Sequence, residues 1–164
     1  MGTIVLNELD SKFKYDVTEE PGGENIKLCF SCGLCTAGCP VAEIDESYNP
    51  RKIIRMVLLG MRKQVLSSDL IWLCSLCYTC YAHCPQNVKF TDITRALRSM
   101  AMKEGYVHPS FANRIKLIDN VSQRLRHGMA ISALKSKSAD VTVDPIKLAD
   151  EALRETQRVK GLVS

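Results

Sequence analysis

The sequence predicts a mostly α-helical fold with two cysteine-rich loops at its centre. Three observations carry this prediction. Helix-start signals recur along the chain, apolar residues follow each of them at helical spacing, and all eight cysteines fall into two short runs between the helical segments. A chain of 164 residues has the length of one domain, or of one compact domain with extensions.

The two cysteine runs have the same spacing. The first is Cys29-Phe-Ser-Cys32-Gly-Leu-Cys35-Thr-Ala-Gly-Cys39-Pro40, and the second is Cys74-Ser-Leu-Cys77-Tyr-Thr-Cys80-Tyr-Ala-His-Cys84-Pro85. Each run reads C-x2-C-x2-C-x3-C-P, with an offset of 45 positions between corresponding cysteines. This repeat indicates an internal duplication.

This spacing is typical of loops that hold [4Fe–4S] clusters. Three thiolates at i, i+3 and i+6 can surround one cubane, whereas the fourth cysteine, beside a proline that turns the chain, is expected to bind the other cluster. The predicted ligands of the first cluster are Cys29, Cys32, Cys35 and Cys84. The predicted ligands of the second cluster are Cys74, Cys77, Cys80 and Cys39. Such crossed ligation makes folding depend on the metal.

Disulfides and zinc are the competing interpretations of the cysteines. Disulfides suit a small secreted chain, but Met1-Gly2-Thr3-Ile4-Val5 lacks the basic start and apolar core of a signal peptide. Structural zinc usually takes two C-x2-C pairs, and here a third cysteine follows each pair and leaves too many thiolates per loop. Two [4Fe–4S] clusters are therefore the predicted cofactors, and we expect a cytoplasmic protein.

The segments between and after the runs carry helix signals. Asn49 and Pro50 suit the N-cap and the first position of a helix. Ser67-Ser68-Asp69 is a second helix start. A third helix is expected to begin at Thr91-Asp92 and to end at Gly105.

A further helix is expected to begin at Pro109-Ser110 and to end near His127-Gly128. Apolar and small side chains recur along it at helical spacing, at Phe111, Ile115, Ile118, Ser122 and Leu125. We expect this stripe, like those of the earlier helices, to pack in the core around the cysteine loops.

The two ends of the chain carry weaker signals. Residues 1–24 are expected to form an arm that can add a strand, and residues 135–144 have the composition of a linker. Asp144-Pro145 then starts a helix that ends at Gly161, and this helix is expected either to dock on another subunit or to pack back on its own domain. The predicted domains are an N-terminal arm (1–24), a two-cluster domain (25–128), and a linker with a C-terminal docking helix (129–164).

Composition argues against several classes of function. The net charge is +4, but Lys and Arg are scattered rather than gathered in one patch, as nucleic-acid binding requires. No apolar run approaches the ~20 residues of a membrane helix. The chain has no Gly-rich dinucleotide fingerprint and no phosphate loop. Two clusters would use all eight cysteines and leave no thiol for disulfide exchange, so the chain is predicted to carry electrons without converting a substrate itself.

These motifs resemble the α-helical ferredoxin family, a module of succinate dehydrogenase, fumarate reductase, glycolate oxidase and heterodisulfide reductase. The sequence is most similar to the C-type subunit, the iron–sulfur subunit, of heterodisulfide reductases. The stretches that carry the resemblance are Cys32-Gly33-Leu34-Cys35-Thr36-Ala37-Gly38-Cys39-Pro40, Asn49-Pro50-Arg51-Lys52, Ile71-Trp72-Leu73-Cys74-Ser75-Leu76-Cys77-Tyr78-Thr79-Cys80-Tyr81 and Cys84-Pro85-Gln86-Asn87-Val88. It covers residues 26–105 well and extends loosely to residue 128.

The resemblance implies a place in an electron-transfer complex. In this family a flavin and iron–sulfur subunit (A-type) splits electron pairs, the C-type subunit relays single electrons through two [4Fe–4S] clusters, and a catalytic subunit (B-type) reduces a disulfide. In methanogens this substrate is the mixed disulfide of coenzymes M and B. Two alternatives stay open: a relay in a related bacterial complex (sulfur oxidation, quinone-linked or methylenetetrahydrofolate reductase), and a free ferredoxin-like carrier.

Overall fold

The structure, a computed structural model, describes residues 9–136 together with residues 147, 150 and 154. Within these residues the regular elements are helices, and none forms a β-strand. The predicted mostly α-helical fold is therefore confirmed. The chain divides into two compact units, Met1–Pro109 and Ser110–Ser164.

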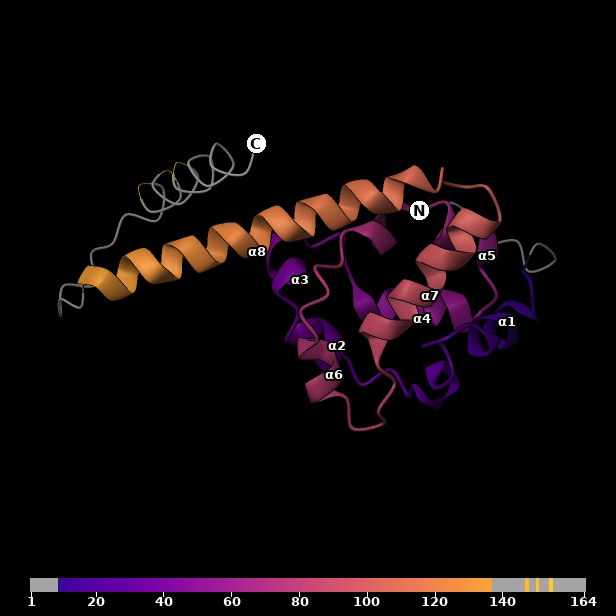
Figure 1. Cartoon of the computed structure of the whole chain (residues 1–164). Helices are drawn as coiled ribbons and strands as arrows, with labels where there is room; N and C mark the ends of the chain where they lie inside the picture. The colour runs from indigo at the N-terminus through magenta and orange to yellow at the C-terminus, as the bar shows by residue number, and fades with distance from the viewer. Residues whose placement is uncertain (1–8, 137–146, 148–149, 151–153, 155–164) are drawn as a thin grey trace. The chain divides into compact units, whose positions relative to one another are not determined.

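The first unit is a succession of short helices joined by loops (Figure 1). The longest of them in the described part, α7, has 14 residues, whereas the helices beside the cysteines have four or five. With 3-10 helices marked η, the order is α1 (Phe13–Glu19), η2 (Ile26–Leu28), α2 (Leu34–Ala37), α3 (Pro40–Ile44), α4 (Pro50–Leu58), α5 (Arg62–Leu66), η3 (Asp69–Trp72), α6 (Thr79–His83) and α7 (Phe90–Lys103).

Helix α4 begins where the sequence predicts. Asn49 has extended backbone, and its side chain accepts a hydrogen bond from the backbone N–H of Lys52 at 2.9 Å. Pro50 occupies the first position, where no backbone N–H is needed. Ile53 and Val57 lie one turn apart and are 3% and 0% exposed, so α4 turns its apolar face to the core.

Two further predicted helix signals are also confirmed. The hydroxyl of Ser68 accepts a hydrogen bond from the backbone N–H of Leu70 at 3.1 Å and caps η3. Helix α7 begins at Phe90, one residue before the predicted Thr91, and Gly105 follows its last turn with φ +77°. Ile93 and Leu97, one turn apart on α7, are fully buried.

The N-terminal segment differs from the prediction, because residues 13–19 form helix α1 and not a strand. Phe13 and Val17 are fully buried, four residues apart on one face of this helix. In a strand Tyr15 would share that face, yet it is 50% exposed. Helix α1 contacts η2, α4 and α7, so the apolar pair belongs to the core of the first unit.

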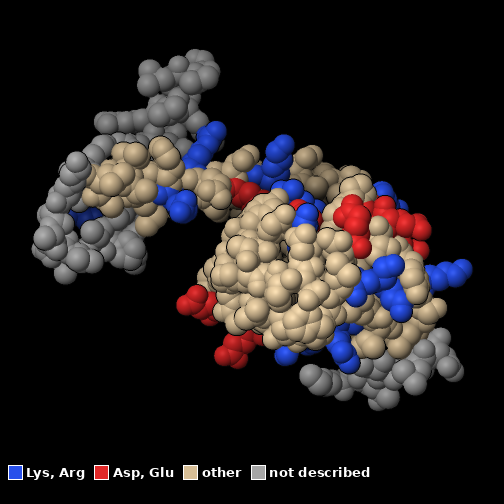
Figure 2. All heavy atoms as spheres, turned by 90° about the horizontal axis from the view of Figure 1, so that it is seen from below, with Lys and Arg blue, Asp and Glu red and all other residues tan. Residues whose placement is uncertain are grey.

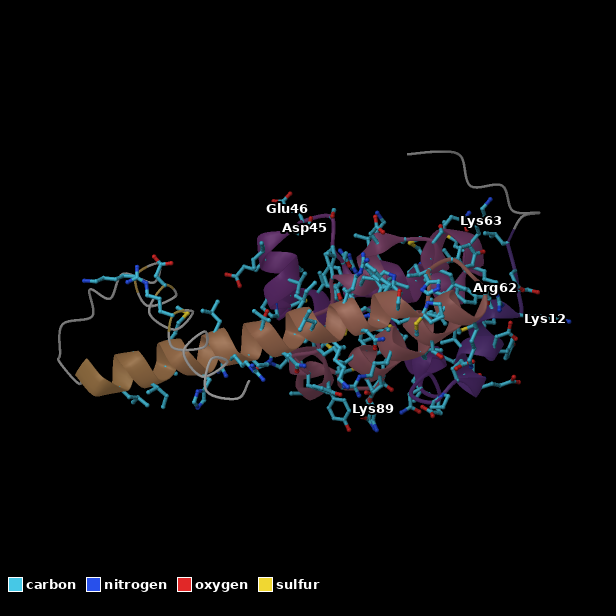
Figure 3. The ribbon with its side chains drawn as sticks, turned by 45° about the horizontal axis from the view of Figure 1, so that its top comes forward. Lys12, Asp45, Glu46, Arg62, Lys63 and Lys89 are labelled. Carbon is cyan, nitrogen blue, oxygen red and sulfur yellow. The ribbon has the colours of Figure 1, made fainter. Side chains whose placement is uncertain are left out.

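Arg62, which is labelled in Figure 3, joins three segments of this unit through hydrogen bonds. It lies at the start of α5, and its guanidinium donates to Asp10 at 3.0 Å, to Asp16 of α1 at 2.5 Å and to Glu104 after α7 at 2.6 Å. A cation held by three carboxylates is a network and not an isolated surface pair, so it fixes α1 against α5 and the end of α7.

The second unit contains helix α8 (Ser110–Ser136), which begins at the predicted position. It does not end near Gly128 as expected, because Gly128 keeps helical backbone and the helix continues to Ser136. A glycine inside a helix costs only about 1 kcal/mol, which its neighbours in a long helix can offset. The expected burial of its apolar stripe is not met at Ile118, which is 58% exposed.

The remaining expectations for the ends lie almost entirely outside the described residues. The predicted linker begins at residue 135, which lies inside α8, while the docking helix is described only at residues 147, 150 and 154. The domain boundaries at residues 24/25 and 128/129 therefore stay a prediction. No helix within the described ranges is both long and apolar enough to cross a membrane.

Candidate metal centre

The two cysteine runs match in backbone conformation as well as in spacing. Ser31 and Leu76, 45 positions apart, have φ +61° and +52°, and Gly33 and Tyr78 have φ +89° and +61°. The left-handed region is costly for a residue with a side chain. Its use at matching positions of both runs indicates that each loop needs this turn to bring its cysteines around one centre.

Helices α2 and α6 follow these turns, and they contact each other. They begin at corresponding positions of the two runs, and the cysteines that follow them, Cys39 and Cys84, have nearly the same extended backbone. A Cβ atom on Gly38 would lie only 2.5 Å from Nδ1 of His83, the residue at the corresponding position of the second run. The glycine therefore allows the two short helices to pack closely.

A pocket lies between the two runs. Four of the thiols around it are the predicted ligands of the first cluster, Cys29, Cys32, Cys35 and Cys84. The apolar side chains Ile54, Val88 and Phe90 also line it, together with Ser31, Gly33, Arg51 and Cys80. Two thiols of the second run, Cys80 and Cys84, therefore line the pocket with three of the first.

Hydrogen bonds to the loop hold the first run in place. The Thr36 hydroxyl donates to the side-chain oxygen of Asn49 at 3.0 Å and accepts from the backbone N–H of Arg51 at 3.1 Å. Asn49 therefore caps α4 and anchors α2 with the same oxygen. The backbone N–H of Ser31 donates to the Cys29 sulfur at 3.4 Å, and that of Val88 donates to Cys84 at 3.3 Å.

Electrostatic contacts link Cys35 to thiols of both runs. Burial raises the pKa of the Cys35 thiol to about 11; the Thr36 hydrogen bond opposes this effect, and Cys29, Cys80 and Cys32 add to it. Like charges so close together disfavour free thiolates, and a bound cation removes that penalty.

Three of the four cysteines predicted for the second cluster, Cys39, Cys74 and Cys80, lie near a buried tyrosine. Tyr48 is 1% exposed, and its hydroxyl shares a hydrogen bond with the Cys74 side chain. Burial, and then the neighbouring Cys74, Cys39 and Cys80, raise the pKa of this hydroxyl. Cys39 of the first run therefore lies with Cys74 and Cys80 of the second.

The remaining thiols of the second run are also hydrogen-bonded. The sulfur of Cys80 lies 3.2 Å from the hydroxyl of the buried Thr91, and the sulfur of Cys77 lies 3.4 Å from the Thr79 hydroxyl. Burial raises the pKa of Cys80 against the Thr91 hydrogen bond, and the nearby Cys74 and Cys77 raise it further. At Cys77 burial is outweighed by hydrogen bonds from Thr79 and Ser75, so its pKa is lowered.

A buried arginine fixes the segment that leads into the second run. Arg98 of α7 is 7% exposed, and its guanidinium donates to the carbonyl oxygens of Ile71, Trp72 and Cys74 at 2.9, 3.1 and 2.8 Å. Its central carbon also lies 5.4 Å from the centroid of the Trp72 ring. The first cysteine of the second run is thereby held by a permanent positive charge.

The donor set fits iron–sulfur clusters. None of the eight cysteines forms a disulfide, two are buried, four are half-buried, and Cys32 and Cys77 are exposed. In the described part of the chain, no three His, Cys, Asp or Glu side chains lie close enough to hold a single metal ion. A [4Fe–4S] cluster binds each thiolate through a different iron, so its ligands need not lie as close together as those of a single ion. Cysteine thiolates are the ligands that such clusters prefer.

Sequence reasoning missed Tyr48, Thr91 and Arg98, which support the second run. A signal for two of them was present, because Thr91, Thr94 and Arg98 recur at helical spacing next to the apolar face of α7 and are all buried. Polar residues that recur on a buried face usually have a partner. Tyr48 lies in a loop and carries no such periodic signal.

Comparisons with known proteins point to iron–sulfur proteins. The family model of the 4Fe-4S dicluster domain matches residues 25–88. The chain is 39% identical to a C-type iron–sulfur subunit of the CoB–CoM heterodisulfide reductase of Methanocaldococcus jannaschii over 140 residues, which is 81% of this chain and 71% of the relative.

Two further relatives extend the match. The chain is 32% identical over 159 residues to the C-type iron–sulfur subunit of the CoB–CoM heterodisulfide reductase of Methanopyrus kandleri, covering 94% of this chain and 80% of that protein. It is 31% identical over 129 residues to the C-type subunit of the H2:CoB–CoM heterodisulfide,ferredoxin reductase of Methanothermobacter thermautotrophicus, covering 79% of this chain and 66% of that protein. The chain therefore belongs to the family of C-type iron–sulfur subunits of heterodisulfide reductases, within the α-helical ferredoxins.

Proposed function

We propose that this chain is the electron-transfer subunit of a heterodisulfide-reductase-type complex in the cytoplasm. It relays single electrons through two [4Fe–4S] clusters, from an A-type flavin and iron–sulfur subunit to a B-type disulfide-reducing subunit, and converts no substrate itself. The observation that carries the proposal is the pocket where Cys29, Cys32 and Cys35 of the first run meet Cys84 of the second.

In this proposal each site takes three cysteines from one run and the fourth from the other. Cys29, Cys32, Cys35 and Cys84 hold the first cluster. Cys74, Cys77, Cys80 and Cys39 hold the second cluster. When bound, such clusters supply one-electron chemistry. The contacts of Tyr48 with Cys74, Cys39 and Cys80 support the second set, because they bring the Cys39 thiol to the other run.

The residues around the pocket orient the thiols and limit the access of water. Ile54, Val88 and Phe90 form the apolar wall of the first site, while Asn49 and Thr36 fix the loop that carries its cysteines. A low-polarity environment favours a defined redox change over exchange of the metal with solvent.

The surface beside the cysteine loops suits the approach of a partner protein. Figure 2 views the molecule from the side on which α2 and α6 lie in Figure 1, and much of that face of the first unit is free of charged side chains. Residues 25–42 and 70–91 contain no Asp or Glu. The exposed side chains of these loops include large apolar and aromatic groups, namely Leu28, Phe30, Leu34, Leu73, Tyr78 and Tyr81. Exposed patches of this kind mark protein–protein contacts.

Anaerobic purification of the native chain from its host tests the proposal. The expected preparation is brown, contains about eight iron and eight sulfide per chain, and co-purifies with a flavin protein and a protein that reduces a disulfide. A colourless, well-folded chain that holds zinc contradicts the clusters. A lone species of 18.3 kDa with full electron-transfer competence contradicts the complex and supports a free carrier.

A further inference from the structure

The structure distinguishes the two cysteine runs by a buried charge. Arg98 donates to the carbonyl oxygens of Ile71, Trp72 and Cys74, so its guanidinium is fixed beside the first cysteine of the second run. The offset of 45 positions pairs Arg98 with Ile53, a buried apolar residue of α4. The duplication has therefore placed a permanent cation at one run and a neutral side chain at the corresponding position of the other.

The first run has a basic neighbour of a different kind. Arg51 lines the pocket of the first site, but it is exposed to water. Water and salt screen an exposed charge, whereas a charge inside the protein acts through a much lower effective dielectric constant. The field of Arg98 at the second site is therefore stronger than that of Arg51 at the first.

Hydroxyl groups add to this difference. Tyr48, Thr79 and Thr91 place hydroxyls at the sulfurs of Cys74, Cys77 and Cys80, where they can donate to thiolates. At the first site, the Cys35 side chain is hydrogen-bonded to that of Thr36, while Cys29 and Cys84 accept from backbone amides at 3.4 and 3.3 Å, so hydroxyls meet three sulfurs of the second site and one of the first. Hydrogen bonds to the sulfurs and nearby positive charge both favour the reduced, more negative state of a cluster and raise its potential.

Burial acts in the opposite direction. Cys74 and Cys80 are buried, and a dry environment makes the addition of negative charge less favourable. Arg98 supplies a positive charge inside this same dry region, adjacent to the Cys74 backbone. Because burial lowers the effective dielectric constant, it also strengthens the attraction between this charge and the added electron.

We propose that Arg98, assisted by the Tyr48 hydroxyl, makes the second site the more easily reduced of the two. This proposal rests on the two-cluster function proposed above, and it assigns a direction to electron transfer between the two sites. One electron leaves the first site, which is oxidised, and one electron enters the second site, which is reduced. The step takes up no proton and needs no further reactant. Arg98 and Tyr48 are positioning residues and not catalytic ones, because they act through the ligands.

Redox titration followed by EPR spectroscopy tests this inference on the full chain reconstituted with iron and sulfide. Cys32→Ala and Cys77→Ala, each altering one run, assign the two midpoint potentials. We expect the second site of the unaltered chain to have the higher potential. Arg98→Met lowers the equilibrium constant for its reduction about tenfold, a shift of about 59 mV for a one-electron couple, and Tyr48→Phe shifts it in the same direction.

Arg95→Met is the matched control. It removes the same charge from the same helix. The Arg95 guanidinium lies 5.5 Å from the centroid of the Tyr78 ring of the second run, but it is exposed and screened by water, so both midpoints should shift far less than in Arg98→Met. If Arg98→Met does not bind iron, Tyr48→Phe decides, because it removes a single oxygen atom. Unchanged potentials in Tyr48→Phe, or a shift at the first site alone, overturn the inference. An iron content far below eight per chain in the unaltered protein instead contradicts the proposed function.

Discussion

Cys80 borders both groups of thiols. It lines the pocket formed by Cys29, Cys32, Cys35 and Cys84, yet its sulfur lies 3.2 Å from the Thr91 hydroxyl on the side of the second run. A residue in this position makes the two sites neighbours that share part of one wall. The environment of one site therefore depends on the occupancy of the other, because charge on either acts on the same buried thiol.

The fourth cysteine of each run provides a test of the crossed arrangement. Cys39→Ala should remove the cluster held mainly by the second run, and Cys84→Ala should remove the one held mainly by the first, because each thiol lies with the other run. Each variant is expected to lose about four of eight irons. Mössbauer and EPR spectra identify the surviving cluster. A Cys39→Ala chain that keeps the second-run cluster contradicts the crossed arrangement.

Arg62 provides a residue-scale test of stability. Arg62→Met should lower the free energy of unfolding by about 1–2 kcal/mol, because three carboxylates lose their shared cation in a partly exposed network. Denaturant titration of the iron-loaded chain measures this change. Lys63→Met, at the exposed neighbouring position, serves as the control and should change stability by less than about 0.5 kcal/mol. Equal effects of the two variants contradict the role of the network.

At the scale of elements, the corner between α4 and α5 depends on one glycine. Gly60 has φ +86°, and its carbonyl accepts a hydrogen bond from the backbone N–H of Asp10 at 2.8 Å. A Cβ atom at this position would overlap the carbonyl oxygen of Asp10. The segment before α1 therefore packs directly against the corner, where no side chain can fit.

Gly60 and Gly105 both have positive φ, so a comparison of alanine variants at the two positions distinguishes backbone strain from steric overlap. Gly105→Ala should cost about 1–2 kcal/mol, because Gly105 has φ +77° but open space around it. Gly60→Ala should cost about 3 kcal/mol or more, because the overlap with Asp10 adds to the same strain. Thermal unfolding of the two variants under identical iron loading measures the difference. Equal costs contradict close packing at the α4–α5 corner.

The helices with strong local signals were predictable from the sequence, and those that depend on distant partners were not. The cap at Asn49 and the glycine after α7 act within one turn, so they can be recognised without the fold. Helix α1 has only seven residues, so its local helix signal is weak. Its buried residues Phe13 and Val17 are stabilised by packing within the first unit, where α1 contacts α4 and α7. The predicted end of α8 was wrong, because Gly128 resembles a helix stop signal but keeps helical backbone.

The cysteine site also has some features that the sequence predicts and others that it does not. Its eight cysteines and their repeat can be recognised from chain spacing, which the duplicated loops repeat in their backbone, whereas the grouping of the cysteines into two ligand sets stays a prediction. Of the polar residues around the second run, Tyr48 and Arg98 come from distant parts of the sequence, while Thr91 lies 11 positions after Cys80. The spacing of Arg98 on α7 indicates a buried partner but does not identify it, and Tyr48 carries no such signal, because tertiary packing alone makes these contacts.

For the whole molecule, metal and fold should be lost together in the first unit. Its cysteine loops contain only short helices, and the thiols of both runs meet between them. Removal of iron with a chelator under anaerobic conditions should therefore reduce helical circular dichroism and expose Trp72, which is 8% exposed in the structure. Tryptophan fluorescence and circular dichroism follow this transition. An iron-free chain with unchanged spectra contradicts a metal-dependent fold.

The first unit should keep its iron without the second. All residues that line the pocket, and the residues that support the second run, lie before Pro109. A chain that ends at Pro109 is therefore expected to bind about eight iron and to give the same two EPR signals as the full chain. Loss of either signal in a folded, truncated protein contradicts the independence of this unit.

The pocket that joins both runs also sets an order of events during synthesis. Cys29, Cys32 and Cys35 leave the ribosome long before Cys84, so a nascent chain carries three thiols of that pocket with no fourth. Until translation passes Cys84, these thiols are open to oxidation or to capture of the wrong metal. Delivery of iron after the second run has emerged would avoid this exposure.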